Sequence, residues 1–249
     1  MKPVVIGIIG IPIKFDKKED NFLEFFSPGL TDSLRLRTKK FLEKMNEKRD
    51  NKIRVIDLGE LIIDQKFSES KEPRIKGISK DCLDELAQEL RSKIKGLDLL
   101  IVYGGTHTGA YLLYHLPGKI ERFDLHEDDQ KIGVLFHTSY MNYSKELKSP
   151  SQILDHGWSD LLDGILDEKK EEFKTDIFDI DVDYYTSTEF CRLKKEDERD
   201  HLKKIERRIE EVKPRIIGLF EFQTLDGTEE GLKKVLRIVW SGVKAIEES

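Results

Sequence analysis

Cysteine is scarce in this 249-residue sequence, which contains only Cys82 and Cys191. The two residues lie far apart and follow no metal-ligand spacing, so the sequence predicts no disulfide framework. A reducing compartment suits such a chain, and we expect a cytoplasmic protein.

Long apolar runs are also missing. No stretch approaches the roughly 18 uncharged apolar residues that identify a candidate membrane-spanning helix. The apolar run at residues 4–9 is short, lacks a small-residue cleavage site and is soon followed by Lys14 and Asp16. We interpret it as a first β-strand rather than a signal peptide, and we expect no membrane partner.

An excess of basic residues is absent too, since 43 Lys and Arg face 49 Asp and Glu and the net charge is -6. A nucleic-acid-binding surface needs a basic face, so no nucleic-acid partner is predicted. Charged residues nevertheless make up 37% of the chain, against roughly 25% in an average domain. This balance predicts many solvent-facing ion pairs, either in a thermostable network or simply along solvated helices.

The hydrophobic content of 38% is enough to bury a core. We find no internal repeat and no long linker, and expect one domain over residues 1–249. Apolar runs of strand length alternate with helical patterns. Strands are predicted at residues 4–9, 53–58, 97–103, 120–124, 132–136, 177–182 and 215–222. Helices are predicted at residues 33–48, 79–95, 195–212 and 228–246.

This alternation predicts an α/β fold with a mostly parallel sheet and helices on both faces. In such sheets, ligands bind beyond the carboxyl ends of the strands. Three segments stay ambiguous: residues 149–168, the stretch 157–164 within them, and residues 14–28. The last of these, treated as a loop, could form a lid or pack into the core, and we favour the core.

Acidic residues and histidines gather where the predicted strands end. These candidates are His107, Asp124, His126, Asp128, His137, Asp179, Asp181 and Glu221. In extended backbone, Asp124 and His126 point to one side of their segment, and so do Asp179 and Asp181. A lone histidine or Asp-x-His is usually an ordinary loop feature. What favours a site is the coincidence of so many at the ends of apolar strands, where carboxylates are costly unless paired or metal-bound.

The chemistry of this set points to divalent cations. Carboxylates that converge at one sheet edge repel one another and raise each other's pKa, and bound cations remove that cost. Carboxylates and imidazoles without thiolates favour a fairly hard metal such as Mn²⁺ over a structural zinc. Two such ions could share a hydroxide and lower its pKa.

Taken in order, these segments resemble the arginase/agmatinase/formiminoglutamase (ureohydrolase) superfamily. The matching segments are Gly-Gly-Thr-His at 104–107, Asp-Leu-His-Glu-Asp at 124–128, His137, Asp-Ile-Asp at 179–181, and Glu221. The flanking segments 9–12, 29–35 and 56–59 also resemble that family. The resemblance is therefore colinear over nearly the whole chain.

The resemblance implies a three-layer αβα sandwich around a mostly parallel sheet, with two Mn²⁺ ions at the strand ends. It implies that one ion is held by His107, Asp124, Asp128 and Asp179. The other ion would be held by Asp124, His126, Asp179 and Asp181. A metal-bridging hydroxide would attack a guanidino or amidino carbon. Asp128 would also belong to the catalytic set, with His137 as proton shuttle and Glu221 as partner of the cationic substrate.

Departures from the family pattern bear on the substrate. Thr106 replaces the usual aspartate, Gln223 and Thr224 stand where Asn-Pro is common, and the segment 129–178 is short. Free arginine is therefore disfavoured, and the aromatics that follow the acidic run in 179–185 give a weak hint of peptide arginine.

Two other functions stay open. One is a zinc-type amide deacetylase on the same fold, which would not need both His107 and Asp128. The other is a catalytically silent scaffold. A homo-oligomer is also possible through the last predicted helix, although Val239, Trp240 and Val243 fit a core equally well.

Overall fold

The computed structural model describes residues 3–18, 21–47, 49, 53–62, 80–105, 107–114, 116–123, 153–156, 176–182, 195–220 and 229–248. The first part of the chain forms β1 (Val4–Ile11), β2 (Ile13–Lys18), β3 (Asn21–Phe26), α1 (Asp32–Glu47), β4 (Ile53–Glu60) and α2 (Lys80–Lys93). The middle forms β5 (Leu99–Gly104), the 3-10 helix η2 (His107–Ala110), α3 (Tyr111–Tyr114), β6 (Ile120–Phe123) and β7 (Ile153–His156). The last part forms β8 (Ile177–Asp181), α8 (Lys195–Val212), β9 (Ile216–Phe220) and α9 (Glu229–Glu247).

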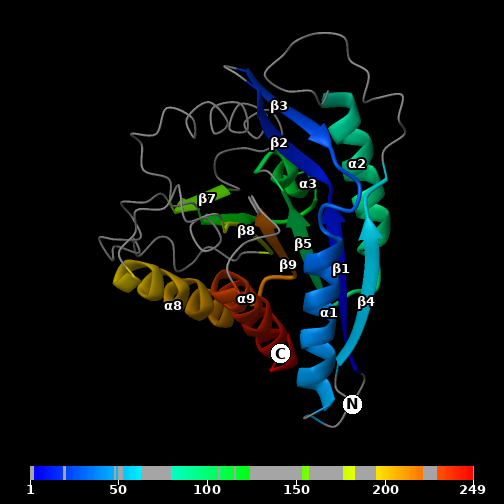
Figure 1. Cartoon of the computed structure of the whole chain (residues 1–249). Helices are drawn as coiled ribbons and strands as arrows, with labels where there is room; N and C mark the ends of the chain where they lie inside the picture. The colour runs from blue at the N-terminus through cyan, green and yellow to red at the C-terminus, as the bar shows by residue number, and fades with distance from the viewer. Residues whose placement is uncertain are drawn as a thin grey trace.

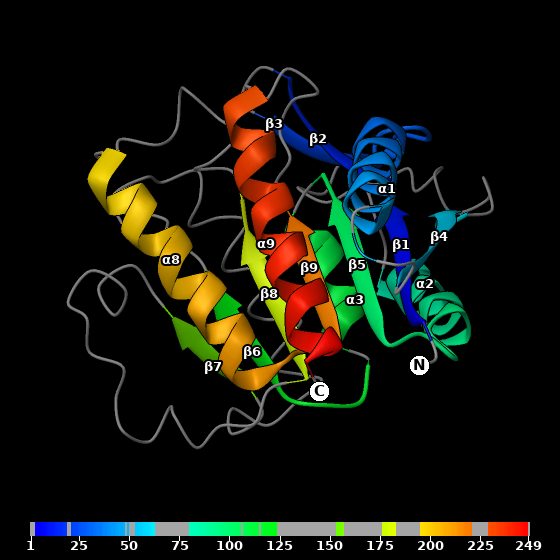
Figure 2. The ribbon, with the colours of Figure 1, turned by 90° about the horizontal axis from the view of Figure 1, so that it is seen from below.

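The centre of the fold is a seven-stranded sheet in the order β4-β1-β5-β9-β8-β6-β7. Every neighbouring pair in it is parallel, which confirms the prediction of a mostly parallel sheet. Helices α1, α8 and α9 cover one face, and α2 and α3 cover the other (Figures 1 and 2). The predicted three-layer arrangement is therefore the one observed.

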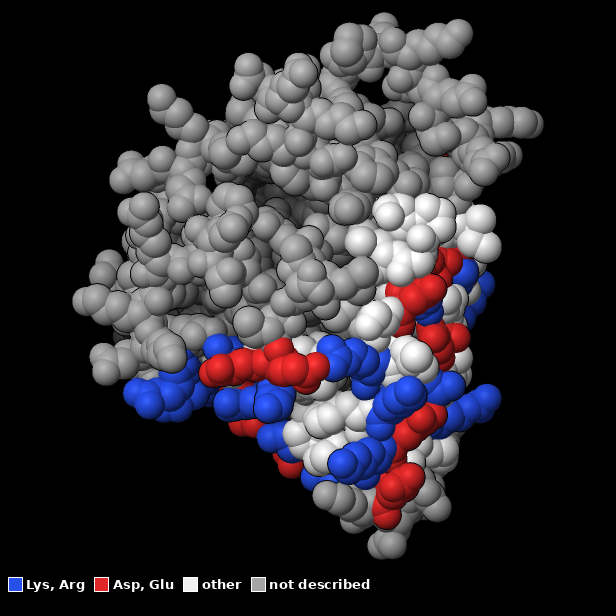
Figure 3. Space-filling view, in the orientation of Figure 1, with Lys and Arg blue, Asp and Glu red and all other residues white. Residues whose placement is uncertain are grey.

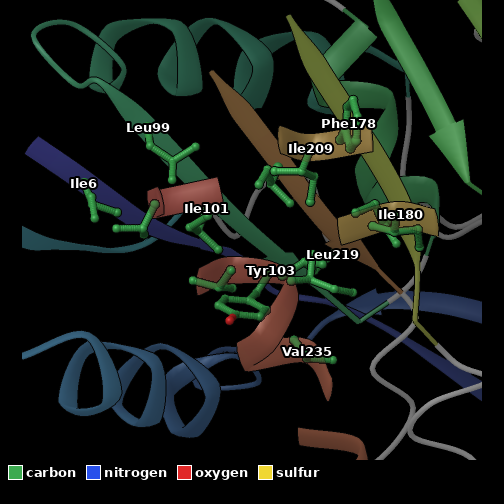
Figure 4. Packing of buried hydrophobic residues seen from close by; sticks show 14 of the residues in the cluster. Ile6, Leu99, Ile101, Tyr103, Phe178, Ile180, Ile209, Leu219 and Val235 are labelled. Carbon is green, nitrogen blue, oxygen red and sulfur yellow. The ribbon is translucent and has the colours of Figure 1, made fainter. Parts of the chain in front are cut away.

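The face under α1, α8 and α9 carries the larger apolar core. Alternate residues of the strands supply it, because successive side chains of a strand point to opposite faces. Helix α8 contributes a stripe of Leu202, Ile205 and Ile209, all fully or almost fully buried. Figure 4 shows part of this core between the strands and the helices. The rings of Phe123 and Phe178 pack with their centroids 4.9 Å apart.

The last helix, α9, packs along the same face. Val239 and Val243 are buried in the core, as their core interpretation predicted. Trp240 is only partly buried, where its ring meets Phe41 edge-on and carries the Arg49 guanidinium 4.6 Å above its centroid. This helix thus joins the sheet to α1.

Two stretches differ from the sequence prediction. Most of the segment 14–28, treated as a loop, forms the antiparallel hairpin β2–β3, paired from Ile13↔Phe26 to Lys18↔Asn21. The charged residues of β2 broke the apolar run that would have revealed a strand. Strand β7, inside the ambiguous stretch 149–168, pairs with β6 at the end of the sheet. The predicted strand at 132–136 lies outside the described residues.

Charged side chains of both signs interleave over α1, α8 and α9 (Figure 3). Several join one helix to another. Glu206 of α8 accepts two hydrogen bonds from Arg237 of α9, and Glu210 meets Lys244 at 3.3 Å. The expectation of many solvent-facing ion pairs is confirmed for the described part of the chain. None of the described helices combines the length and apolar character that a membrane span requires.

Candidate functional site

Four adjacent strands of the sheet carry or directly precede predicted site segments. In the order β5-β9-β8-β6, β5 leads into His107, β9 precedes Glu221, and β6 precedes Asp124. Strand β8 itself carries Asp179 and Asp181. Because all four strands run parallel, their carboxyl ends meet at the same edge. The strands that lead to residues far apart in the sequence therefore end at the same edge.

Asp179 and Asp181 are the only predicted ligands whose side chains the structure describes, and both are fully buried, with 0% of their surface exposed. Their strand neighbours Phe178 and Ile180 belong to the core under α8 and α9, whereas Ile177 belongs to the opposite core. By strand alternation, both carboxylates thus lie on the face covered by α2 and α3. Two carboxylates in an apolar interior are costly unless something compensates their charge.

A glycine in β9, the strand beside β8, leaves space on this face for apolar side chains. Asp179 is paired in register with Gly218 of β9. A Cβ atom on Gly218 would overlap the ring of Phe220 and Leu113 of α3. The missing side chain lets these two apolar groups close over β9 next to the Asp179 position.

The backbone of His107 begins the 3-10 helix η2, directly after β5 and Gly105. This short helix lies on the ends of β1 and β9, because a Cβ on Gly109 would sit 3.1 Å from Phe220 Cε1 and 3.2 Å from Ile11 Cγ2. The predicted ligand His107 therefore starts at the same sheet edge as the two aspartates, although its side chain is outside the described part.

Tyr103, near the end of β5, points to the other face and belongs to the core under α1. Its hydroxyl lies 2.6 Å from the hydroxyl of Thr38 in α1. Burial raises the pKa of the Tyr103 phenol well above its ordinary value, and the hydrogen bond to Thr38 offsets this only in part. The pair anchors β5 to α1 and faces away from the aspartates.

The remaining predicted site residues lie outside the described residues. They are Asp124, His126, Asp128, His137 and Glu221. Among the residues the structure describes, no three His, Cys, Asp or Glu side chains come together as a metal site. The metal-binding and catalytic assignments of those five residues therefore stay predictions.

Sequence reasoning did not single out one polar network at this edge, formed by Thr31, Arg35, Asp57 and Glu60. The flanking segments 29–35 and 56–59 contained Thr31, Arg35 and Asp57, but not Glu60, and were noted only for their resemblance. The signal that was available is a pair of acidic residues, Asp57 and Glu60, on either side of Gly59 at the end of a predicted strand.

Comparison with known proteins finds similar folds among solved structures. No protein-family model matches the sequence, and no curated protein sequence matches it significantly. Solved structures do match. The agmatine ureohydrolase of Thermoplasma volcanium aligns with a TM-score of 0.60 at 13% identity, over 99% of this chain and 90% of that one.

Two further structures agree. The arginase of Bacillus caldovelox aligns with a TM-score of 0.59 at 12% identity, over 100% of this chain and 99% of that one. A formiminoglutamase variant from Trypanosoma cruzi with Mn²⁺ aligns with a TM-score of 0.52 at 12% identity, over 96% of this chain and 92% of that one. The resemblance to the ureohydrolases is thus confirmed at the level of the fold.

Proposed function

We propose that this protein is a hydrolase that uses two Mn²⁺ ions to cleave a C–N bond of a guanidino or amidino compound. One observation carries the proposal: Asp179 and Asp181 are fully buried on one face of β8, at the carboxyl edge of the sheet. The fold shared with proteins described as arginase, agmatine ureohydrolase and formiminoglutamase supports it.

The described residues fit such a metal pair. Two carboxylates on one side of a single strand offer hard oxygen ligands, which suit Mn²⁺. A cation between them would also compensate the cost of burying both charges. The adjacent strands end where further oxygen and imidazole ligands follow in the sequence.

We assign the metal ligands to six residues: His107, Asp124, His126, Asp128, Asp179 and Asp181. Bound Mn²⁺ would supply a nucleophile at neutral pH by lowering the pKa of water. His137 would carry the proton to the leaving nitrogen, and Asp128 would complete the catalytic set. Glu221 would bind the cationic head of the substrate, for which a carboxylate is the matching partner.

Metal content and urea release test this proposal together. Protein purified without chelator should hold about two equivalents of metal. With added Mn²⁺ it should release urea from at least one member of a panel that contains agmatine, arginine, a peptide arginine and other guanidino compounds. Metal without urea would move the chemistry to another amidine or amide. No metal binding by the wild-type chain would refute the proposal.

A matched pair of variants, one in β8 and one just before it, sharpens the test. Asp181→Asn should lose at least one equivalent of metal, because a neutral amide is a weaker ligand for a hard divalent cation than a carboxylate. Asp176→Asn changes an exposed carboxylate just before β8, at the opposite edge of the sheet, and should keep both equivalents. Full metal content in Asp181→Asn would contradict the assignment.

The proton-carrying role has its own test. His137→Asn should lower turnover by about 10²-fold or more, in the range of general acid–base catalysis, while metal content stays unchanged. Loss of metal from this variant would show that His137 is a ligand instead.

A further inference from the structure

A carboxylate at the end of β4 holds the start of α1 in place. Glu60 accepts hydrogen bonds from the backbone N–H of Gly29 at 2.6 Å and from that of Thr31 at 2.7 Å. It also accepts one from the Thr31 hydroxyl at 2.6 Å. Three donors of one short segment thus converge on one side chain, and charge-assisted bonds of this kind are stronger than neutral ones.

The end of β4 is shaped to present this carboxylate. Gly59 has a φ of 75°, a left-handed conformation that favours glycine, and its N–H donates to Asp57 at 3.0 Å. The pairing of β4 with β1 shifts here, so that Glu60 stands opposite Gly10. Such irregularities re-aim a side chain at the end of a strand.

A buried arginine closes the network from the helix side. Arg35, one turn into α1, is only 6% exposed. Its Nε donates to the Thr31 hydroxyl oxygen at 3.2 Å, and its other nitrogens bind Asp57 and Asp32. Asp57, which accepts the hydrogen bond from the Gly59 N–H, is therefore also bound to α1, the helix whose start Glu60 holds.

The segment 29–31 packs against two glycines at the sheet edge. A Cβ on Gly10 would overlap the hydroxyl of Thr31, so this side chain fills the space that Gly10 leaves. A Cβ on Gly105 would overlap Leu30 and come within 2.5 Å of the Ile13 carbonyl oxygen. Leu30 is the residue between the two backbone groups that Glu60 holds, and it packs where β5 leads into η2.

We propose that Glu60 is a positioning residue for the proposed metal ligand His107. Glu60 holds residues 29–31 in place, and this keeps the Leu30 side chain against Gly105. That contact in turn fixes the backbone position of Gly105, two residues before His107. The inference rests on the proposed function, because it concerns a ligand of that site. A metal ligand must be held to within a few tenths of an ångström, so a loosened support lowers metal affinity.

Glu60→Gln tests the inference. The amide keeps the size of the side chain, but its NH₂ group would face at least one of the three donors whose hydrogen bonds the carboxylate accepts. Its matched control is Asp176→Asn, which removes a carboxylate that accepts from the Lys119 backbone N–H at 2.9 Å at the opposite edge of the sheet. The Kd for Mn²⁺ should rise about tenfold in Glu60→Gln, the low end for groups that orient metal ligands. It should stay unchanged in Asp176→Asn.

A second variant acts on the same path without touching the carboxylate. Leu30→Ala leaves the backbone donors of Gly29 and Thr31 in place but removes the contact with Gly105. It should weaken Mn²⁺ binding to a similar extent. The double variant should weaken it by less than the product of the two single effects, since both changes release the same segment.

Hydrogen exchange of residues 104–110 gives a reading that does not need metal. Exchange there should speed up in Glu60→Gln and in Leu30→Ala, but not in Asp176→Asn. Unchanged exchange in Glu60→Gln, or Mn²⁺ affinity equal to that of the wild type, would overturn the positioning role. If the wild-type protein binds no Mn²⁺, the proposed function fails by itself, and the exchange of residues 104–110 in the metal-free chain then decides the positioning role.

Discussion

The buried ion pair between β6 and α8 allows a sharp prediction about stability. Arg208 Nε donates to Glu121 Oε1 at 2.8 Å, with side-chain exposures of 7% and 0%. Burial alone lowers the pKa of Arg208, but the hydrogen bond and charge of Glu121, helped by Glu211, outweigh it and raise the pKa above its ordinary value. The guanidinium is therefore charged at every accessible pH, so it cannot avoid the cost of burial by losing its proton.

Replacing Glu121 with leucine should leave that charge in an apolar layer. Glu211 is too weak a substitute, because its carboxylate lies 3.4 Å from the guanidinium and is 39% exposed. The free energy of unfolding should fall by about 3 kcal/mol or more, as for other buried pairs that lose one partner. Urea denaturation followed by circular dichroism measures this change through the midpoint and slope of the transition.

The double variant Glu121→Leu with Arg208→Met separates the pair from the packing. Both charges are then gone, and stability should return to within about 1 kcal/mol of the wild type or exceed it. A loss below about 1 kcal/mol in the single variant would show that water reaches the guanidinium. A double variant as unstable as the single one would show that α8 needs the pair for its position. Either result would refute the reasoning.

Three further predictions follow from the described contacts. Because burial raises the pKa of Tyr103, its neutral phenol contributes stability that is present below about pH 10 and lost as pH rises. Urea titrations at pH 9 to 11 should therefore show Tyr103→Phe losing less stability than the wild type, by up to about 1.4 kcal/mol per pH unit. Gly10→Ala should lower stability by about 1–3 kcal/mol, since its methyl group overlaps Thr31, and an unchanged melting temperature would contradict this. Glu206→Gln should cost at most about 1 kcal/mol at low salt and nothing measurable in 1 M NaCl, because its bonds with Arg237 are solvent-exposed.

The sequence predicted the sheet and its long helices because their apolar patterns are strong and local. Strand β5 has only apolar residues before its glycine, and α8 has its apolar residues at helical spacing. The hairpin β2–β3 and strand β7 lack such patterns, since charged residues interrupt them. Their pairing depends on neighbours that a local pattern does not encode.

The candidate site was predictable in part for the same reason. Asp179 and Asp181 alternate with apolar residues, and this predicted that they share one side of a buried strand. Which face they occupy follows only from the helices that pack on each side of the sheet. The role of Glu60 needed still more, because its three donors come from a segment about thirty residues earlier.

The strand order also determines how late in synthesis the central sheet can be completed. The chain builds β1, β4 and β5, then moves outward to β6 and β7, and only then returns with β8 and β9 to the space between β5 and β6. Until residue 220 has left the ribosome, two growing pieces of sheet each expose an unpaired edge facing that space. The strands nearest the candidate site are thus the last to arrive, and a nascent chain halted before them would be prone to aggregation.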